Sequence, residues 1–571
     1  MPPSRACWNC RKMRKKCDLY RPICGRCTRR GTACHYKHDN KPEWMDGGVK
    51  EERMAAQMRG EREETLRRRR ESAVHVSSDD VPVAEDSTGE ASVPPQSPAR
   101  DLATPTSDLQ ETSPGTSNYG MELRSKTSKL FPQSGEPFGR SDTILIMFYL
   151  EHLLPFLFPF YRPSILEGGR AWIFEMMISS PVVRQATLCQ SSYFFSLVRG
   201  TADLGGARDE LLAQITDAIA ILRQALDFMK ASGFRDHLHS AVRAMASIMQ
   251  IQRFELAVLS FRNWQVHLSA AVAVFRKLLE CVVESREPRS RFNAIMNSLG
   301  PPSSLSPPQN DQIPSAEKAA FGFSSPLVIL DDIIASIALQ EQPQLYEYHD
   351  SLLGDTEGTG EPPINLEAVI GVKNWVILQI GEIAALEAWH QQCKRARNLD
   401  AMELVHRATL IKKSIVAPFK ELEKELVVVQ KERSLLDNFI PAPSQGSLVS
   451  LVWAHAALIS LSVVQVGWQP TDSKVHYHVT QVINLLNRRR SRALLRTMVW
   501  PLCVAGCLAV PELEVHFRAL VETLQPPSIF GTAHKALEIM ENVWSNREAD
   551  VVATRNLATC FRIQGDVVLL V

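Results

Sequence analysis

Most of the chain carries apolar residues at helical spacing. Over residues 142–571, Leu, Ala, Ile and Val dominate, and long windows repeat with the period of an α-helix. One window covers residues 211–226, and a second begins at Ala241 and continues to Leu279. No run of alternating apolar and polar residues stands out there as a strand signal. We therefore predict a large all-α C-terminal domain over residues 142–571, which grows by adding helix pairs rather than around one small core.

Breaks in the helical pattern predict loops and linkers. Residues 300–326 and 354–363 are rich in Pro, Gly or Ser and are predicted to be loops. Residues 77–141 are rich in Ser, Pro, Thr and acidic residues, so they bury too little apolar surface to fold and are predicted to be a disordered linker. Residues 46–76 are strongly charged and lack the apolar a and d positions of a coiled coil, which favours a solvated linker helix over a dimer zipper.

One uncharged stretch raises the question of a membrane. Residues 447–468 contain no charged side chain over 22 positions, which is long enough to span a bilayer. However, His455, Gln465 and four serines dilute its apolar character, and it follows a Pro-rich loop within the helical pattern. We therefore predict a buried core helix here, and no membrane partner.

Positive charge is concentrated at the N-terminal end. Residues 1–45 contain 12 Lys and Arg against 3 Asp and Glu, a formal charge of +9, whereas the whole chain carries +1. Such concentration is typical of a protein that binds nucleic acid, because Lys and Arg release counterions from phosphates. Four consecutive arginines at residues 67–70 are a candidate nuclear localisation signal, although such a run is also common at a solvated helix end.

The same N-terminal segment holds six of the chain's 12 cysteines in two copies of Cys-x2-Cys-x6-Cys, offset by 17 positions: Cys7, Cys10, Cys17, Cys24, Cys27 and Cys34. Two tetrahedral zinc ions need eight ligand positions, which six cysteines fill only if two sulfurs bridge. A disulfide framework is the alternative, but it expects a secretory signal, and residues 1–6 offer no apolar run. We therefore predict a site for two zinc ions with all six cysteines as ligands.

The cysteine segment resembles the fungal Zn2Cys6, or binuclear zinc cluster, transcription factors. Residues 10–18 match the family pattern Cys-Arg-x-basic-basic-x-Lys-Cys-Asp, and Pro22 matches its loop proline. One departure is Met13, where Arg or Lys is common, which puts one phosphate contact in doubt. The resemblance implies that Cys7 and Cys24 bridge the two ions. It also implies that Cys10 and Cys17 complete the ligands of one ion, and that Cys27 and Cys34 complete those of the other.

The basic run after Cys10 is free of Gly and Pro, which predicts a short helix with its charges on one face. The resemblance implies that Arg14 contacts a base in a CGG triplet, and that other groups in the run bind phosphates. The predicted DNA-binding residues are Arg11, Arg14, Lys15, Lys16 and Cys17, the last through its backbone N–H. If metal ligands did not lie on either side of the run, these charges would indicate only a solvent-exposed helix face.

Stretches of the helical region resemble the regulatory domain of the same family, namely residues 148–152, 155–161, 168–172, 467–470, 496–507 and 569–571. The chain shows no phosphate-binding loop or hydrolase motif, so we predict no enzyme. The resulting hypothesis is a nuclear transcription factor that regulates RNA polymerase II transcription at CGG-containing promoter sites, for a metabolic, resistance or secondary-metabolite gene cluster. A homodimer through the helical domain and a small-molecule effector or co-regulator are further hypotheses.

The alternative is a DNA-tethered ligand receptor, or an enzyme-like helical domain with the zinc cluster as an accessory. A pocket of converging polar groups with shifted pKa values in the helical domain would favour this alternative.

Overall fold

The computed structural model describes the residues 10, 17–18, 24, 27–28, 34, 139–200, 204–282, 286–300, 313–355, 361–432, 443–489, 491–547 and 555–571. The chain separates into two units, residues 1–122 and 123–571. The predicted linker helix over 46–76 and the arginine run at 67–70 lie outside the described residues, as does the predicted disordered linker as far as residue 138.

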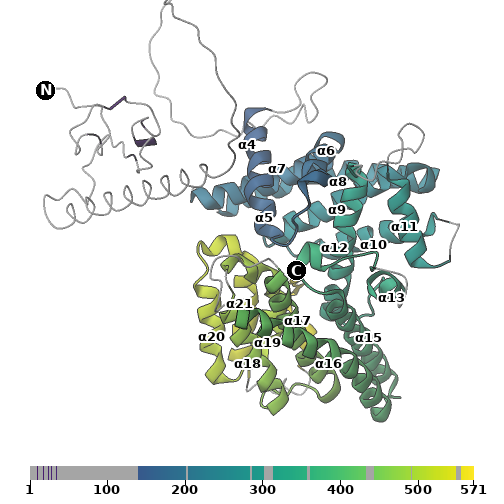
Figure 1. The fold of residues 1–571 in the computed structure, drawn as a ribbon, viewed down its shortest axis with the longest axis vertical. Helices are drawn as coiled ribbons and strands as arrows, with labels where there is room; N and C mark the ends of the chain where they lie inside the picture. Colours follow the sequence, from purple (N-terminus) through teal and green to yellow (C-terminus); the bar gives the residue numbers. More distant parts are fainter. Residues whose placement is uncertain are drawn as a thin grey trace, which may run out of the picture. The chain divides into compact units, whose positions relative to one another are not determined.

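The second unit is built from helices (Figure 1). It opens with α4 (Arg140–Phe148), two residues before the expected start, and continues through a π-helical turn η1 (Tyr149–Leu153) into α5 (Leu154–Leu157). The next helices are α6 (Ala171–Ser179), α7 (Pro181–Arg199), α8 (Leu204–Ser232), α9 (Leu238–Ala257), α10 (Trp264–Glu280) and α11 (Pro288–Ser298). Short 3-10 turns lie at η2 (Ile165–Glu167) and η3 (Arg235–His237).

The remaining helices of this unit are α12 (Ala316–Leu339), α13 (His349–Leu353), α14 (Glu367–Ile370), α15 (Asn374–Ala396), α16 (Ala401–Glu432), α17 (Pro443–Val466), α18 (Ser473–Asn487), α19 (Val499–Cys507), α20 (Pro511–Glu522), α21 (Gly531–Ser545) and α22 (Leu557–Cys560). The 3-10 turns η4 (Tyr346–Tyr348), η5 (Arg492–Met498) and η6 (Pro527–Phe530) connect some of them. A hairpin of β1 (Arg562–Ile563) and β2 (Asp566–Val567) follows α22, with Arg562 opposite Val567.

Local sequence explains where several helices begin and end. Before α7, the Ser180 hydroxyl accepts a hydrogen bond from the Val183 N–H at 3.3 Å, and proline occupies the first helical position. Gly200 ends α7 with a φ of 64°, a left-handed conformation that glycine adopts without strain. Before α18, the Asp472 carboxylate accepts hydrogen bonds from the backbone N–H groups of Lys474 and Val475, at 2.9 and 3.1 Å.

The core is formed around a few apolar helices. Helix α9 packs against α7, α10 and α12, and α17 packs against α15, α16, α18 and α19 (Figure 1). By length and composition alone, α12 and α17 are apolar enough to cross a membrane, but 83% and 94% of their most apolar stretches are buried within the fold. The prediction of a buried core helix over residues 447–468 is therefore confirmed by α17.

One sequence prediction is corrected here. The predicted loop over residues 300–326 is wrong for its second half, because α12 begins at Ala316 and continues through Pro326. Proline cannot donate a backbone hydrogen bond, but the burial of Pro326 in the core outweighs the loss of that bond. The neighbouring Ser325 hydroxyl donates to the Phe321 carbonyl at 2.7 Å. The apolar window over residues 241–279 forms two helices, α9 and α10, with Leu259 at a φ of 58° between them.

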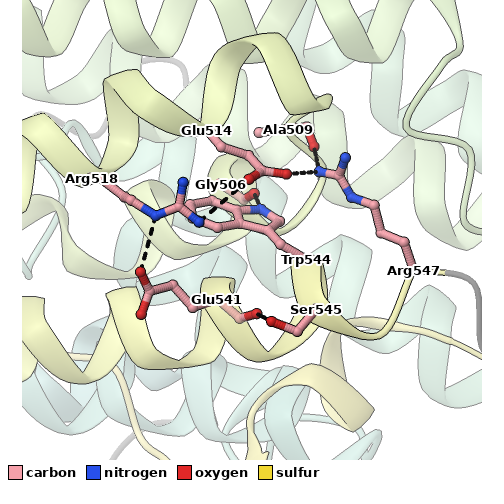
Figure 2. Close-up of polar contacts among 8 residues, drawn as sticks. All are labelled: Gly506, Ala509, Glu514, Arg518, Glu541, Trp544, Ser545 and Arg547. Atoms are coloured by element: carbon pink, nitrogen blue, oxygen red, sulfur yellow. Dashed lines mark hydrogen bonds and ion pairs between the residues drawn. The ribbon is translucent and has the colours of Figure 1, made fainter.

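Close packing fixes the last three long helices (Figure 2). The Trp544 indole N–H donates to the Gly506 carbonyl at 2.8 Å, which joins α21 to α19. A side chain at position 506 has no room, since a Cβ there would lie 1.8 Å from Met540 Sδ. Arg518 of α20 ion-pairs with Glu541 of α21 at 3.1 Å and lies over the Trp544 ring at 4.8 Å. These contacts join α19 and α20 to the same indole of α21.

Candidate metal centre

The described cysteines of the first unit bring their sulfurs together. Two groups have all their ligand atoms within 4.8 Å of one another, and Cys24 belongs to both: Cys10, Cys17 and Cys24, and Cys24, Cys27 and Cys34. Three of the five are buried, while Cys17 and Cys34 are half-buried. Six cysteines that bind two metal ions in tetrahedral sites must share two sulfurs, and Cys24 has the position of one of them.

The distance between the Cys10 and Cys24 sulfurs fits two ligands of one zinc ion and excludes a disulfide between them. Cys10 Sγ and Cys24 Sγ lie 3.7 Å apart. Two sulfurs on one tetrahedral zinc lie about 3.8 Å apart, given Zn–S bonds of about 2.3 Å. A disulfide would require about 2.0 Å. The residues present therefore fit a zinc cluster, in agreement with the prediction from spacing.

Backbone groups around the sulfurs hold the site. The Cys27 N–H points to Cys24 Sγ at 3.4 Å, and the Cys24 N–H points to Cys34 Sγ at 3.4 Å. Thr28 donates to the Cys24 carbonyl from its backbone N–H at 3.0 Å and from its hydroxyl at 3.2 Å, and both Cys27 and Thr28 are helical. N–H groups that donate to ligating sulfurs orient them and offset their negative charge.

Several predicted site residues lie outside the described part of the chain, so their roles remain predictions: Cys7, Arg11, Arg14, Lys15 and Lys16. Cys17 is described, and its half-buried position belongs to the first sulfur group. The other predicted ligands that are described all fall in one of the two groups.

Polar residues that the sequence did not single out converge inside the helical unit. Tyr149, Gln250, Arg253 and Arg496 come from η1, α9 and η5 and line one cavity. Burial raises the pKa of Tyr149 to about 12, and burial together with the nearby Arg253 lowers the pKa of Arg496 to about 10. No short-range sequence signal could have found this group, because its members lie far apart along the chain.

A second group of buried polar residues is structural. His455 of α17 and His478 of α18 place their Nδ1 atoms 2.9 Å apart. Burial lowers the pKa of His455 to about 3 and that of His478 to about 4, so both rings are neutral at pH 7 and share one hydrogen bond. The pair joins two helices of the core and offers no acid–base chemistry near neutral pH.

Two adjoining sulfur groups in a strongly basic segment define a DNA-binding protein built on a binuclear metal cluster. The chain belongs to the fungal Zn2Cys6 transcription factors. Residues 5–43 match the fungal Zn(2)-Cys(6) binuclear cluster domain, and residues 144–561 match the fungal specific transcription factor domain. The cluster of this family binds two zinc ions. The predicted family, fold class, zinc cofactor and transcription-factor function are thereby confirmed, and the protein is not an enzyme.

Similar proteins include transcription factors and regulators from other fungi. The chain is 30% identical to "Transcription factor dibT" of Pestalotiopsis microspora over 100% of both chains. It is 27% identical to "Pestheic acid cluster transcriptional regulator 3" of Pestalotiopsis fici over 96% of each, and 24% identical to "ustiloxin B cluster transcription factor ustR" of Aspergillus flavus over 95% of this chain and 93% of that one. No solved structure matches the chain.

Proposed function

We propose that this protein acts in the nucleus and regulates RNA polymerase II transcription of a secondary-metabolite gene cluster at promoter sites that contain CGG. The names of two relatives, which refer to pestheic acid and ustiloxin B clusters, support the kind of target. The proposal assigns DNA binding to residues 1–45, a charged linker helix to 46–76, a disordered linker to 77–141 and regulation to 142–571. The single observation that carries the proposal is the pair of sulfur groups that share Cys24 in a segment of charge +9.

Zinc has a structural role in this proposal. Cys7 and Cys24 would each serve both ions, and the remaining four cysteines would supply the other ligands in pairs. The bound ions hold together a segment whose described core consists of cysteines alone. The cysteine residues fix the backbone at both ends of the basic run, so the run is presented to DNA in one conformation.

Arg14 reads the triplet, since an arginine can donate two hydrogen bonds to guanine O6 and N7 in the major groove. Arg11, Lys16 and the Cys17 N–H bind phosphates, and Lys15 lies on the same face. These contacts position the cluster and add affinity that depends on salt. We expect Arg14→Ala to cost about 1–3 kcal/mol of binding free energy and to relax base preference without unfolding.

A single triplet specifies too little sequence for a genome, because three base pairs recur about once per 64 positions against many competing sites. We propose that the helical unit supplies the missing specificity by pairing two chains, so that two triplets at a fixed spacing are bound. A signal molecule or co-regulator bound by this unit would then set the level of transcription. The arginine run at 67–70 is proposed to direct nuclear entry.

The test is a selection from random double-stranded DNA with the zinc-loaded full chain. Enrichment of two CGG triplets at one spacing supports a dimer, and one triplet supports a monomer that reads its flanking bases. The Cys17→Ala variant is the control that should enrich nothing, since one zinc loses a ligand. If the wild-type chain enriches no CGG-containing site, the proposed recognition is wrong.

A further inference from the structure

A cavity of about 80 Å³ lies inside the helical unit where its helices meet. Residues of η1, α9, α12, α17, η5 and α19 line it, and Leu570 and Val571 close one side. Figure 1 accordingly places the end of the chain beside α12 and α17. A water molecule occupies about 10–15 Å³ of such space, so the cavity has room for a group as large as an aromatic ring.

One wall of the cavity is aromatic. Trp453 and Trp500 stack with ring centres 5.2 Å apart and planes 21° from parallel. The Trp453 indole N–H donates to the Thr497 carbonyl at 2.8 Å. The Trp500 side chain is 1% exposed, and its indole N–H has no hydrogen-bond partner within the described part of the chain. A buried donor without a partner is uncommon in a folded protein and calls for an acceptor.

The charges around the cavity do not balance. Arg253 pairs with the buried Asp331 through Nη2 and Oδ1 at 2.6 Å, and Arg253 Nε has no partner among the described residues. Arg496 donates to the Ile529 carbonyl at 2.9 Å and lies over the Phe156 ring, but forms no ion pair in the described ranges. Arg253 thus has a carboxylate side chain as its partner, whereas Arg496 has none among the described side chains, and its guanidinium favours an anion in this low-dielectric setting.

Three other polar side chains of the wall, those of Tyr149, Gln190 and Gln250, form hydrogen bonds with one another. Gln250 Nε2 donates to the Gln190 side-chain oxygen at 3.0 Å and to the Tyr149 hydroxyl at 3.3 Å. Because this chain of hydrogen bonds is internal, the groups left over for a ligand are the donors at Arg496, Arg253 and Trp500. An excess of hydrogen-bond donors beside an aromatic wall is suited to binding a molecule with an anionic group at one end and an apolar body.

We propose that this cavity binds a small organic carboxylate with an aromatic or similarly compact apolar body. Its carboxylate is held by Arg496, and its body packs on the stacked pair of Trp453 and Trp500. As a regulatory signal, this ligand rests on the proposed function of the chain as a transcription factor. Occupation would add contacts between η5 and α19 on one side of the cavity and α9 and α12 on the other.

The test uses 4-fluorobenzoate with the full-length zinc-loaded protein, followed by the fluorine NMR signal during titration. Neutral 4-fluorobenzamide has nearly the same shape and should bind at least about tenfold more weakly, because it lacks the charge that Arg496 requires. Arg496→Gln should weaken benzoate binding by a similar factor, and Arg496→Lys should restore part of it. The matched control is Arg492→Gln, which removes an exposed cation from the same 3-10 turn and should leave binding within about twofold.

Ala257→Phe provides a variant that keeps both arginines. Ala257 lines the cavity, so a phenyl ring there should fill the space and reduce benzoate binding by about tenfold or more. If Arg496→Gln does not fold, this variant and the comparison of the two probes decide the question. Equal binding of benzoate and benzamide, binding that survives Ala257→Phe, or no binding by the wild-type chain would each overturn the proposal. DNA binding measured on the same samples separates this outcome from a failure of the proposed function.

Discussion

Replacing the shared cysteine should affect both metal ions, whereas replacing an outer cysteine should affect one. Cys24 belongs to both sulfur groups, and Cys34 belongs to only one of them. Cys24→Ser therefore removes one ligand from each tetrahedron, and Cys34→Ser removes one ligand from a single tetrahedron. The two substitutions make the same chemical change, so any difference in zinc content reports the sharing of one sulfur.

The size of the effect follows from how little else stabilises the cluster. The described core of the first unit contains cysteines only, so no apolar packing is seen there that could replace the metal. A structural zinc contributes an apparent free energy of about 10–16 kcal/mol, which exceeds the stability of most small domains. We expect two bound zinc ions in the wild-type chain, one in Cys34→Ser and none in Cys24→Ser once weakly bound metal is removed.

Native mass spectrometry of the full chain counts the bound zinc ions. Fluorescence anisotropy with a CGG-containing duplex measures the DNA affinity of each variant. Affinity of Cys24→Ser should fall by about 10³-fold or more, to the level of non-specific binding. Cys393→Ser in α15 is the control, since this half-buried cysteine lies in the helical unit and should change neither quantity. The reasoning is refuted if Cys24→Ser keeps two zinc ions, or if both cluster variants lose zinc equally.

Two further predictions concern the helical unit. Gly506→Ala should lower the free energy of unfolding by about 1–3 kcal/mol, because the new Cβ would collide with the fully buried Met540; an unchanged urea midpoint would contradict this. Burial lowers the pKa of His349 from 6.5 to about 4, so the unfolded chain takes up the proton first and stability falls as the pH drops from about 6.5 towards 4, by up to about 1.4 kcal/mol per pH unit. Urea midpoints at pH 7 and pH 5 should therefore differ less in His349→Leu than in the wild-type chain.

The parts that could be predicted from sequence depend on contacts close along the chain. The cysteine spacing alone indicates two metal ions, because ligand positions within a short segment are set by a few turns of backbone. The long helices follow from periodicity over 15 to 30 residues, and α17 was predicted as a core helix because its uncharged stretch is diluted by polar residues. In each case the deciding interactions lie within one element or between neighbours.

The parts that could not be predicted depend on contacts between distant segments. Pro326 indicates a loop when only its neighbours are considered, yet burial between other helices keeps α12 intact around it. The hairpin of β1 and β2 is too short to show a strand pattern, and the Trp264 indole N–H holds it from α10 by donating to the Val567 carbonyl at 2.8 Å.

The cavity in the helical unit shows why this limit matters for function. Taken by itself, Arg253 is a helix residue whose guanidinium pairs with Asp331 in the fold. Taken by itself, Arg496 is one basic residue in an apolar stretch. Neither position indicates a binding site until the fold brings the two guanidiniums to one cavity beside Trp500. The site therefore depends on a charge imbalance and an unmatched donor, which are properties of the packed structure. Apolar packing residues build the framework around such a site, while the few polar residues that line it would decide which ligand it accepts.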